Sequence, residues 1–165
     1  MGRGRVEAFS DGVIAILITV MILELKVPHG TGGEALRPML PTILSYALSF
    51  IFLGIYWSNH HHMLQTVERV DGRLLWANLH LLFWLSLVPV VTAWMGDSHT
   101  APLPTALYGV VLILAACAYT ILQAVIIRQH GPDSVLAVAV GRDAKGFSSL
   151  VLYATAIPLA WVHTM

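Results

Sequence analysis

The chain has 165 residues, of which 57% are hydrophobic and only 11% are charged, and its nine basic residues balance its nine acidic ones. Soluble domains carry about 25% charged residues, so this composition excludes a soluble globular domain, and the zero net charge gives no sign of nucleic-acid binding. We therefore predict an integral membrane protein whose surface is solvated mostly by the lipid bilayer.

Five apolar segments are long enough, or nearly so, to cross a bilayer as helices, which takes about 20 residues. In chain order they cover residues 6–27, 41–64, 74–95, 103–127 and 147–163. The connections between them hold Gly, Pro and charged residues, as loops do. The apolar stretch Val135 to Val140 is too short to span and is interpreted as part of an interfacial loop. The sequence thus predicts an all-α, polytopic transmembrane bundle in a single domain over residues 1–165.

Lys and Arg are distributed unevenly among the predicted loops. The N-terminus and the second and fourth loops hold seven of them, whereas the first and third loops hold only Lys26 and Arg37. Cytoplasmic loops are the ones enriched in Lys and Arg, so we expect a multi-pass protein of the cell membrane with a cytoplasmic N-terminus. Five spans then place the C-terminus outside. Because the chain ends directly after the fifth span, we expect that it has been cut short of a final helix.

Polar and ionisable side chains recur at the inner ends of the first three predicted helices. They are Arg5, Ser10 and Asp11 on the first, Asn59, His60, His61 and His62 on the second, and Asn78 and His80 on the third. In or near lipid such groups need partners. The simpler interpretation is a satisfied polar network that holds the three helices together, with some histidines at the headgroup boundary. The alternative is a network that couples to gating or responds to pH, because His titrates near neutrality.

The three consecutive histidines His60 to His62 raise the question of a metal site. Consecutive residues of a helix point about 100° apart, so three in a row do not converge on one ion. No acidic residue lies at the spacing of a zinc protease. We therefore expect no metal and no other cofactor. A membrane-embedded enzyme is not favoured either, because the chain shows no converging ligand set and no nucleophile constellation.

The first predicted helix carries a narrow apolar stripe. At about 100° per residue, one line along the helix collects, within about 40°, Gly12, Ile16, Val20 and Leu23. Thr19 lies about 60° to one side of this line, and Asp11 lies about 140° from it. A helix that faces lipid or packs in a core shows such a stripe too, so the stripe alone does not define a function.

The start of the first helix also carries a motif. Arg5-Val6-Glu7-Ala8-Phe9-Ser10-Asp11 resembles the RxxxFSD signature of the TMEM175 family of potassium channels, in its prokaryotic, single-repeat branch. The run Trp57-Ser58-Asn59-His60-His61 at the end of the second helix is also similar to the family pattern, and the likeness extends along the whole chain. The resemblance implies six helices per repeat, of which five are visible here, and a homotetramer whose four first helices surround a central pore.

The same resemblance implies roles for single residues. Ile16 matches the position of the tightest hydrophobic constriction, Thr19 matches the hydroxyl-bearing position one turn outward, and Val20 and Leu23 continue the pore lining. The signature residues Arg5, Phe9, Ser10 and Asp11 match a group that packs against the second and third helices in the family. The angle of Asp11, away from the Ile16 stripe, agrees with that division.

The function that the resemblance implies is passive conduction of potassium ions by a potassium-selective or potassium-preferring channel. Four Ile16 side chains would form a short apolar neck that gates by dewetting, and a ring of Thr19 hydroxyls would replace part of the hydration that the ion loses. Glu24 lies near the outer end, where a carboxylate raises the local cation concentration, although its angle of about 80° from the stripe weakens that role.

Three other functions remain open. The eight histidines, together with the proton leak known in the family, suggest a proton-conducting channel or leak pathway. A transporter would favour broken helices with charges near the membrane midplane, and the central parts of these spans have almost none. The third hypothesis is a helical bundle that conducts nothing.

Overall fold

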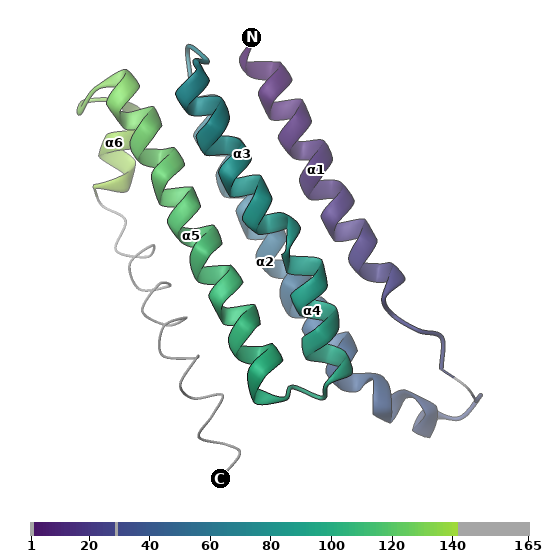
Figure 1. The fold of residues 1–165 in the computed structure, drawn as a ribbon. Helices are drawn as coiled ribbons and strands as arrows, with labels where there is room; N and C mark the ends of the chain where they lie inside the picture. Colours follow the sequence, from purple (N-terminus) through teal and green to yellow (C-terminus); the bar gives the residue numbers. More distant parts are fainter. Residues whose placement is uncertain (1, 29, 142–165) are drawn as a thin grey trace.

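The computed structural model describes residues 2–28 and 30–141, and all its long elements are α-helices (Figure 1). Within these residues, four helical stretches are long and apolar enough to cross a membrane, namely Arg3–Leu23, Gly33–Gln65, Gly72–Asp97 and Pro102–His130. They occupy the positions of the first four predicted spans, and the predicted span 147–163 lies outside the described residues. The expected all-α membrane bundle is thus confirmed.

Helix α1 (Arg3–Leu23) buries one face, which carries Val6, Ser10, Ile14 and Met21. Successive members of this set are four, four and seven positions apart along the helix, the spacing that places side chains on one face. The helix ends at Leu23 rather than at residue 27. The amides of Glu24 and Leu25 bond to carbonyls only three residues back, which tightens the last turn, and Pro28 then disfavours helical backbone before it.

A 3₁₀ helix, η1 (Gly33–Met39), leads into α2 (Leu40–Gln65), whose second residue is a proline. Proline is well tolerated there because the first amides of a helix have no partner inside it. In the middle of α2, the buried Ser49 Oγ lies 2.7 Å from Thr92 Oγ1 and 3.0 Å from Tyr108 OH. Hydroxyl groups therefore join α2 to the two helices that carry Thr92 and Tyr108.

The third predicted span is divided into α3 (Gly72–Ser86) and α4 (Val88–Asp97). Asp71 caps α3, because its Oδ1 accepts from the amide of Leu74 at 2.8 Å. The division falls at Leu87, two residues before Pro89. Proline has no N–H and its ring clashes with the carbonyl four residues back, here that of Leu85. A helix expected to be continuous over residues 74–95 is therefore interrupted inside the span.

Helix α5 (Pro102–His130) is the longest element, and it ends at Gly131, whose φ of 90° is a backbone conformation that favours glycine. The residues predicted as an interfacial loop instead form a short helix, α6 (Val135–Val140). Ser134 Oγ accepts from the amide of Ala137 at 3.3 Å, and Leu136 is buried. A cap and one apolar anchor thus give this segment helical structure.

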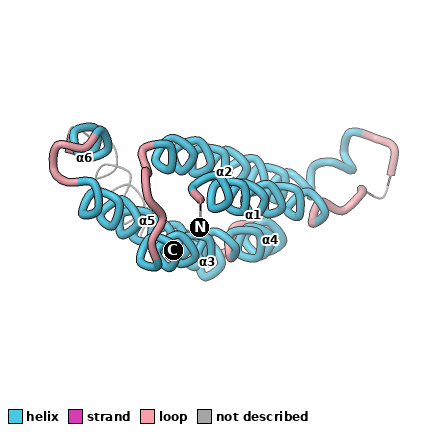
Figure 2. The backbone as a smooth tube through the Cα atoms, turned by 90° about the horizontal axis from the view of Figure 1, so that it is seen from above, coloured by secondary structure: helices cyan, strands magenta, loops and turns pink. Residues whose placement is uncertain are grey.

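The helices pack with α1 against α2, α3 and α4, and with α5 against α3 and α4. Accordingly α1 and α5 lie on opposite sides of the bundle (Figures 1 and 2). The start of α1 and the end of α2 meet at one end, which we call the N-terminal end, where Arg3 Nη1 donates to the carbonyl of Gln65 at 3.0 Å. At the opposite end Lys26 Nζ lies 3.5 Å from Asp97 Oδ2, an exposed pair of the kind that contributes little.

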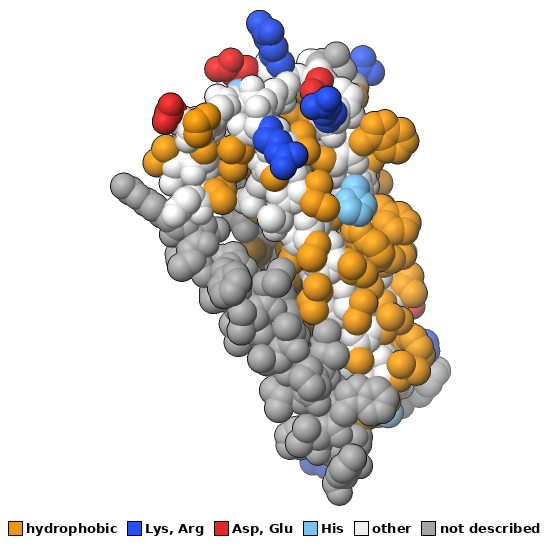
Figure 3. Space-filling view, turned by 60° about the vertical axis from the view of Figure 1, so that its left-hand side comes forward, with side chains coloured by type: hydrophobic (Ala, Val, Ile, Leu, Met, Phe, Trp, Pro, Cys, Tyr) orange, Lys and Arg blue, Asp and Glu red, His pale blue; other side chains and the backbone are white. Residues whose placement is uncertain are grey.

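The surface separates charged from apolar side chains. On the face in Figure 3, Arg, Asp and Glu side chains gather mainly at the N-terminal end, and hydrophobic side chains cover much of the described surface below it. The exposed large hydrophobic residues include Trp76 and Phe83 on α3 and Leu44 and Ile51 on α2. Such a surface suits a bilayer with one polar boundary at the N-terminal end.

Candidate functional site

A chain of hydrogen bonds is buried where α1, α2 and α3 meet. Asn78 Nδ2 donates to Ser10 Oγ at 2.9 Å, and Asn78 Oδ1 lies 2.7 Å from His60 Nε2. Ser10 Oγ in turn donates to the carbonyl of Val6 at 2.8 Å. Ser10, Asn78 and His60 are all buried. One side chain from each of three helices therefore contributes to a single polar joint.

This chain has one consistent direction of donation. A carbonyl only accepts, so Ser10 gives its proton to Val6 and accepts from the NH₂ group of Asn78. The Asn78 oxygen then faces His60, which places a proton on Nε2 of the ring. His60 Nδ1 is buried and has no hydrogen-bond partner among the described residues. Through Ser10 and Asn78, the backbone carbonyl of Val6 on α1 thus determines the tautomer of His60 on α2.

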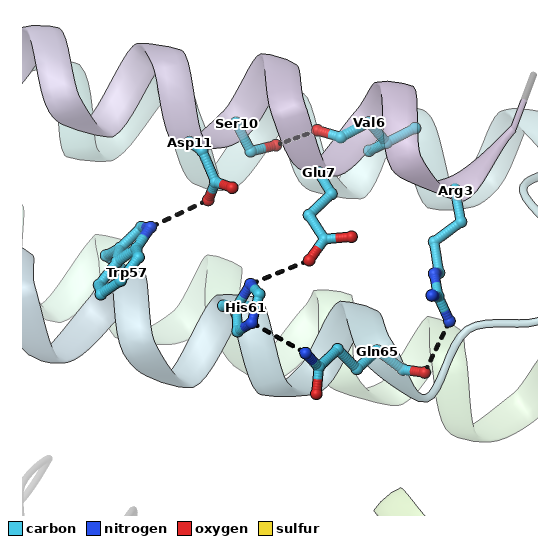
Figure 4. Close-up of polar contacts among 8 residues, drawn as sticks. All are labelled: Arg3, Val6, Glu7, Ser10, Asp11, Trp57, His61 and Gln65. Carbon is cyan, nitrogen blue, oxygen red and sulfur yellow. Dashed lines mark hydrogen bonds and ion pairs between the residues drawn. The ribbon is translucent and has the colours of Figure 1, made fainter.

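A second set of polar contacts joins α1 to α2 as a ladder of three rungs (Figure 4). Trp57 Nε1 donates to Asp11 Oδ1 at 3.0 Å. Glu7 Oε1 lies 2.9 Å from His61 Nδ1, a charge contact that is not aligned as a hydrogen bond. The third rung is the bond from Arg3 to the Gln65 carbonyl. The rungs step by four residues along both antiparallel helices, so each lies one turn from the next.

The structure brings together some of the residues predicted from sequence and leaves others apart. Ser10, His60 and Asn78 form the buried chain, and Asp11 and His61 belong to the ladder. Arg5, Phe9 and Asn59 are exposed, and the Arg5 side chain has no hydrogen bond or ion pair within the described ranges. His80 Nε2 accepts from Trp84 Nε1 at 2.9 Å on its own helix, apart from the joint.

Four ladder residues were missing from the sequence prediction, namely Arg3, Glu7, Trp57 and Gln65. The signal that points to them is the four-residue spacing of polar side chains on each helix, from residue 3 to 11 and from residue 57 to 65. The Arg of the ladder is Arg3, whereas the Arg of the sequence motif is Arg5. Spacing on both helices therefore identifies contacts that the motif does not.

The predicted pore-lining residues lie on the face of α1 that the bundle leaves uncovered. Ile16 is 60% exposed, Val20 40% and Leu23 78%, and Thr19 is exposed as well. The buried residues of α1, including Ile14 and Ser10, face the rest of the bundle. Helix α1 thus holds to the bundle by one face and presents a mostly apolar face outward.

Thr19 is the polar residue beside this apolar stripe. Its Oγ1 donates to the carbonyl of Ile16, three residues back, at 3.0 Å. A hydroxyl that gives its proton to its own helix keeps its oxygen lone pairs for another partner. Oxygen atoms are the groups that replace water around a cation. The uncovered face therefore carries an oxygen acceptor one turn beyond Ile16.

The side chains of the described ranges include no group of three or more His, Cys, Asp or Glu residues that could hold a metal ion. The three adjacent histidines each have different surroundings. His60 is buried against α3, His61 contacts α1, and His62 is exposed. His60 and His61 therefore contact polar groups of different neighbouring helices and do not share a partner.

The fold and the site together define a polytopic helical membrane protein whose first helix is fixed to the bundle by polar groups along one side. The model of the family described as endosomal/lysosomal potassium channel TMEM175 matches residues 5–89. This chain belongs to the TMEM175 family, which confirms the resemblance inferred from its sequence.

Relatives support the assignment along the whole chain. A protein named potassium channel from Chryseobacterium sp. (strain P1-3) is 54% identical over 163 residues, which cover 99% of this chain and 85% of that protein. The crystal structure of a lysosomal potassium-selective channel TMEM175 homolog from Chamaesiphon minutus has a TM-score of 0.82 and 28% identity, and the match covers 97% of this chain and 87% of that one. The endosomal/lysosomal proton channel TMEM175 of Danio rerio is 28% identical over 130 residues, 74% of this chain and 24% of that protein.

Proposed function

We propose that this protein is one subunit of a potassium-selective or potassium-preferring cation channel of the cell membrane, and that four copies surround a pore lined by α1. The observation that carries the proposal is the uncovered face of α1, where Ile16, Val20 and Leu23 are exposed beside the Thr19 hydroxyl. Membership of a family that includes proteins named potassium channels supports it.

In such an assembly the uncovered faces of four α1 helices meet at the axis. Four Ile16 side chains form an apolar neck that is dry when narrow and conducts when it is wide enough for a partly hydrated ion. The Thr19 oxygens, one turn outward, replace part of the water that the ion sheds. Val20 and Leu23 line the path beyond the neck, and Glu24, which is exposed, draws cations to its outer mouth.

The orientation belongs to the same proposal. The N-terminal end carries Arg3, Arg5, Arg69, Arg73 and Arg128, whereas the opposite end carries Lys26 and Arg37. Cytoplasmic ends of membrane proteins are the ones enriched in Arg and Lys. The N-terminal end therefore faces the cytoplasm, and Leu23 and Glu24 lie toward the outside.

The polar joint and the ladder have a separate role in this channel. They lie on the face of α1 that packs against α2 and α3, away from the Ile16 side. Ser10, Asp11, His60, His61 and Asn78 therefore hold the pore-lining helix in position and do not contact the ion. Replacing Asp11 is expected to reduce folding or assembly more than it changes selectivity.

The test is the substitution Ile16→Asn, with Ile22→Asn as matched control on the same helix. Ile22 is 45% exposed and points about 120° away from Ile16. Both variants are reconstituted in liposomes, and the fluxes of potassium, sodium and protons are measured separately. Ile16→Asn should raise the leak and reduce the preference for potassium over sodium, while Ile22→Asn leaves that preference unchanged. A potassium preference unchanged in Ile16→Asn would exclude the pore assignment.

A second candidate function is proton conduction, which the vertebrate relatives favour because they are named proton channels. The same flux assay separates the two candidates. A potassium gradient that drives ion flux without a proton gradient supports the potassium channel. Proton flux that persists when potassium is replaced by an impermeant cation, with no potassium flux, supports the proton channel instead.

A further inference from the structure

The histidines differ in whether their partners allow a second proton on the ring. His130 Nδ1 lies 2.9 Å from the carbonyl of Ile126, while its Nε2 accepts from the backbone amide of Glu68 at 3.0 Å. His80 Nε2 accepts from the indole of Trp84. An amide N–H and an indole N–H only donate, so a proton on either Nε2 would oppose another proton. In both contacts, therefore, the ring nitrogen Nε2 acts as a hydrogen-bond acceptor.

His60 is restricted in another way. Its Nε2 already donates to Asn78, and Asn78 is held in that orientation by Ser10 and the Val6 carbonyl. A second proton would have to reside on Nδ1, which is buried and has no partner among the described residues. A buried charged donor without an acceptor is costly, so the joint is built for a neutral His60.

His61, the next residue, has partners that suit both charge states. Its Nε2 lies 2.8 Å from Gln65 Nε2, so the neutral ring accepts from the Gln65 amide. No hydrogen bond within the described ranges fixes the side-chain oxygen of Gln65. Rotation of that amide by half a turn places its oxygen against Nε2, where it accepts from a protonated ring. On the other side, Glu7 Oε1 lies 2.9 Å from Nδ1.

Charged and titratable groups surround His61 on both helices. Across the contact, α1 presents Arg3, Glu7 and Asp11, and α2 itself carries His60 and His62 as the flanking residues. Glu7 is the charged group in direct contact, while Arg3 is engaged with the Gln65 carbonyl. The side chain of His61 is 33% exposed, so water at the N-terminal end supplies the proton.

We propose that His61 is a reversible proton-binding site: it binds a second proton on Nε2, the Gln65 amide turns to accept from it, and the imidazolium pairs with Glu7. Proton binding converts the middle rung of the ladder from a contact of a carboxylate with a neutral ring into an ion pair. Acid therefore strengthens the contact between α1 and α2 at this rung. This site does not depend on conduction, because proton binding and ion flux are measured separately.

The test is nitrogen-15 NMR of histidine-labelled protein in lipid, titrated from about pH 8 to about pH 5, the range in which histidines change charge. The His61 signals are assigned by their loss in His61→Gln. Over the titration, Nε2 of His61 should change from an unprotonated to a protonated nitrogen, while His60 retains its Nε2–H tautomer. The proposal is overturned if His61 keeps one unprotonated nitrogen to the lowest pH, or if His60 takes up the proton first.

A pair of variants tests the role of the carboxylate. Glu7→Gln removes the charge beside His61, and Glu34→Gln removes an exposed carboxylate from η1 at the opposite end of the bundle. Glu7→Gln should lower the ratio of charged to neutral His61 at a given pH, because a carboxylate in direct contact stabilises the charged ring. Glu34→Gln should leave the ratio unchanged. An equal ratio in wild type and Glu7→Gln would show that Glu7 does not stabilise the charged ring.

Discussion

Asn78 uses both ends of its side-chain amide, donating to Ser10 and accepting from His60 between three helices. Leucine has a similar volume and no polar atom, so Asn78→Leu leaves Ser10 and His60 without their partner in a buried place. We expect the variant to lose about 1–3 kcal/mol of stability, the cost of leaving a buried polar group unsatisfied.

The control for this substitution is Asn59→Leu, because Asn59 is exposed near the same end of α2. Thermal unfolding of both variants in one detergent gives the comparison. Asn78→Leu should melt well below the wild type, and Asn59→Leu should melt close to it. Equal melting temperatures in the two variants would mean that the buried chain contributes nothing to the fold.

At the scale of residues, sequence could identify part of the site. Ser10, His60 and Asn78 are polar residues inside apolar segments, which marks them without a structure. Glu7 and Gln65 lie nearer the helix ends, where polar residues are common, so composition does not mark them. Their positions relative to each other depend on the register of α1 against α2. Packing between the two helices sets that register, so the sequence of either helix alone does not predict it.

The close approach of α2 and α4 depends on Gly96. A Cβ at this position would lie 2.8 Å from the Cα of Thr42, closer than such atoms approach. The conflict involves backbone, so a side-chain rotation does not relieve it. Gly96→Ala should therefore separate the two helices and cost about 1–3 kcal/mol of stability, as overpacked interiors do.

Gly54→Ala is the matched control, because nothing lies within 4 Å of the Cβ that it adds to α2. Alanine is favoured over glycine inside a helix by up to about 1 kcal/mol, so this variant should be as stable as the wild type or slightly more stable. The yield of folded protein in detergent and its melting temperature measure both effects. A Gly96→Ala protein as stable as Gly54→Ala would contradict the close contact.

At the scale of elements, hydropathy predicted the positions of the described spans well, but it did not predict the helix break inside the third span. Four long apolar segments are a strong signal because lipid requires about 20 apolar residues in each. The interruption at Leu87 was missed although Pro89 is visible in the sequence. Prolines occur in continuous membrane helices too, since neighbouring groups can satisfy the freed carbonyl, so the residue alone does not decide between a kink and a break.

The proposed tetramer predicts which residues of different subunits lie near each other. In a Cys117→Ala background, which removes the exposed native cysteine, the substitution Leu23→Cys places a thiol on the uncovered face of α1. Around a shared axis these thiols approach within the distance of about 7 Å between Cα atoms that a disulfide requires. Oxidation in the membrane should therefore link subunits covalently.

Ile22→Cys is the control for this cross-linking, because Ile22 points about 100° away from Leu23 on the same helix. Gel electrophoresis without reductant should show linked subunits for Leu23→Cys and single subunits for Ile22→Cys. If Ile22→Cys links and Leu23→Cys does not, a face of α1 other than the proposed one meets the neighbouring subunit.

At the scale of the whole molecule, the sequence motif is enough to identify the family, whereas the uncovered face of α1 can be identified only from the structure. The stripe from Gly12 to Leu23 is visible in the spacing of residues, but spacing does not distinguish a face packed in the bundle from one left open. Exposure of Ile16 and burial of Ile14, two residues apart on α1, make that distinction.

Within the part of the chain that the structure describes, the polar contacts from α1 to other helices lie at one end of the helix, from Arg3 to Asp11. Beyond them, α1 meets its neighbours through apolar side chains such as Ile14 and Met21, and the pair of Lys26 with Asp97 is exposed. Polar contacts therefore fix the helix at its start, and the contacts farther along are apolar, which have no preferred direction. With about 1.5 Å of rise per residue, a tilt of about 5° at Ser10 moves Ile16 by less than about 1 Å but Leu23 by roughly 1.7 Å. Any tilt about Ser10 therefore moves Leu23 more than Ile16, so the proposed pore would change its diameter less at Ile16 than at Leu23.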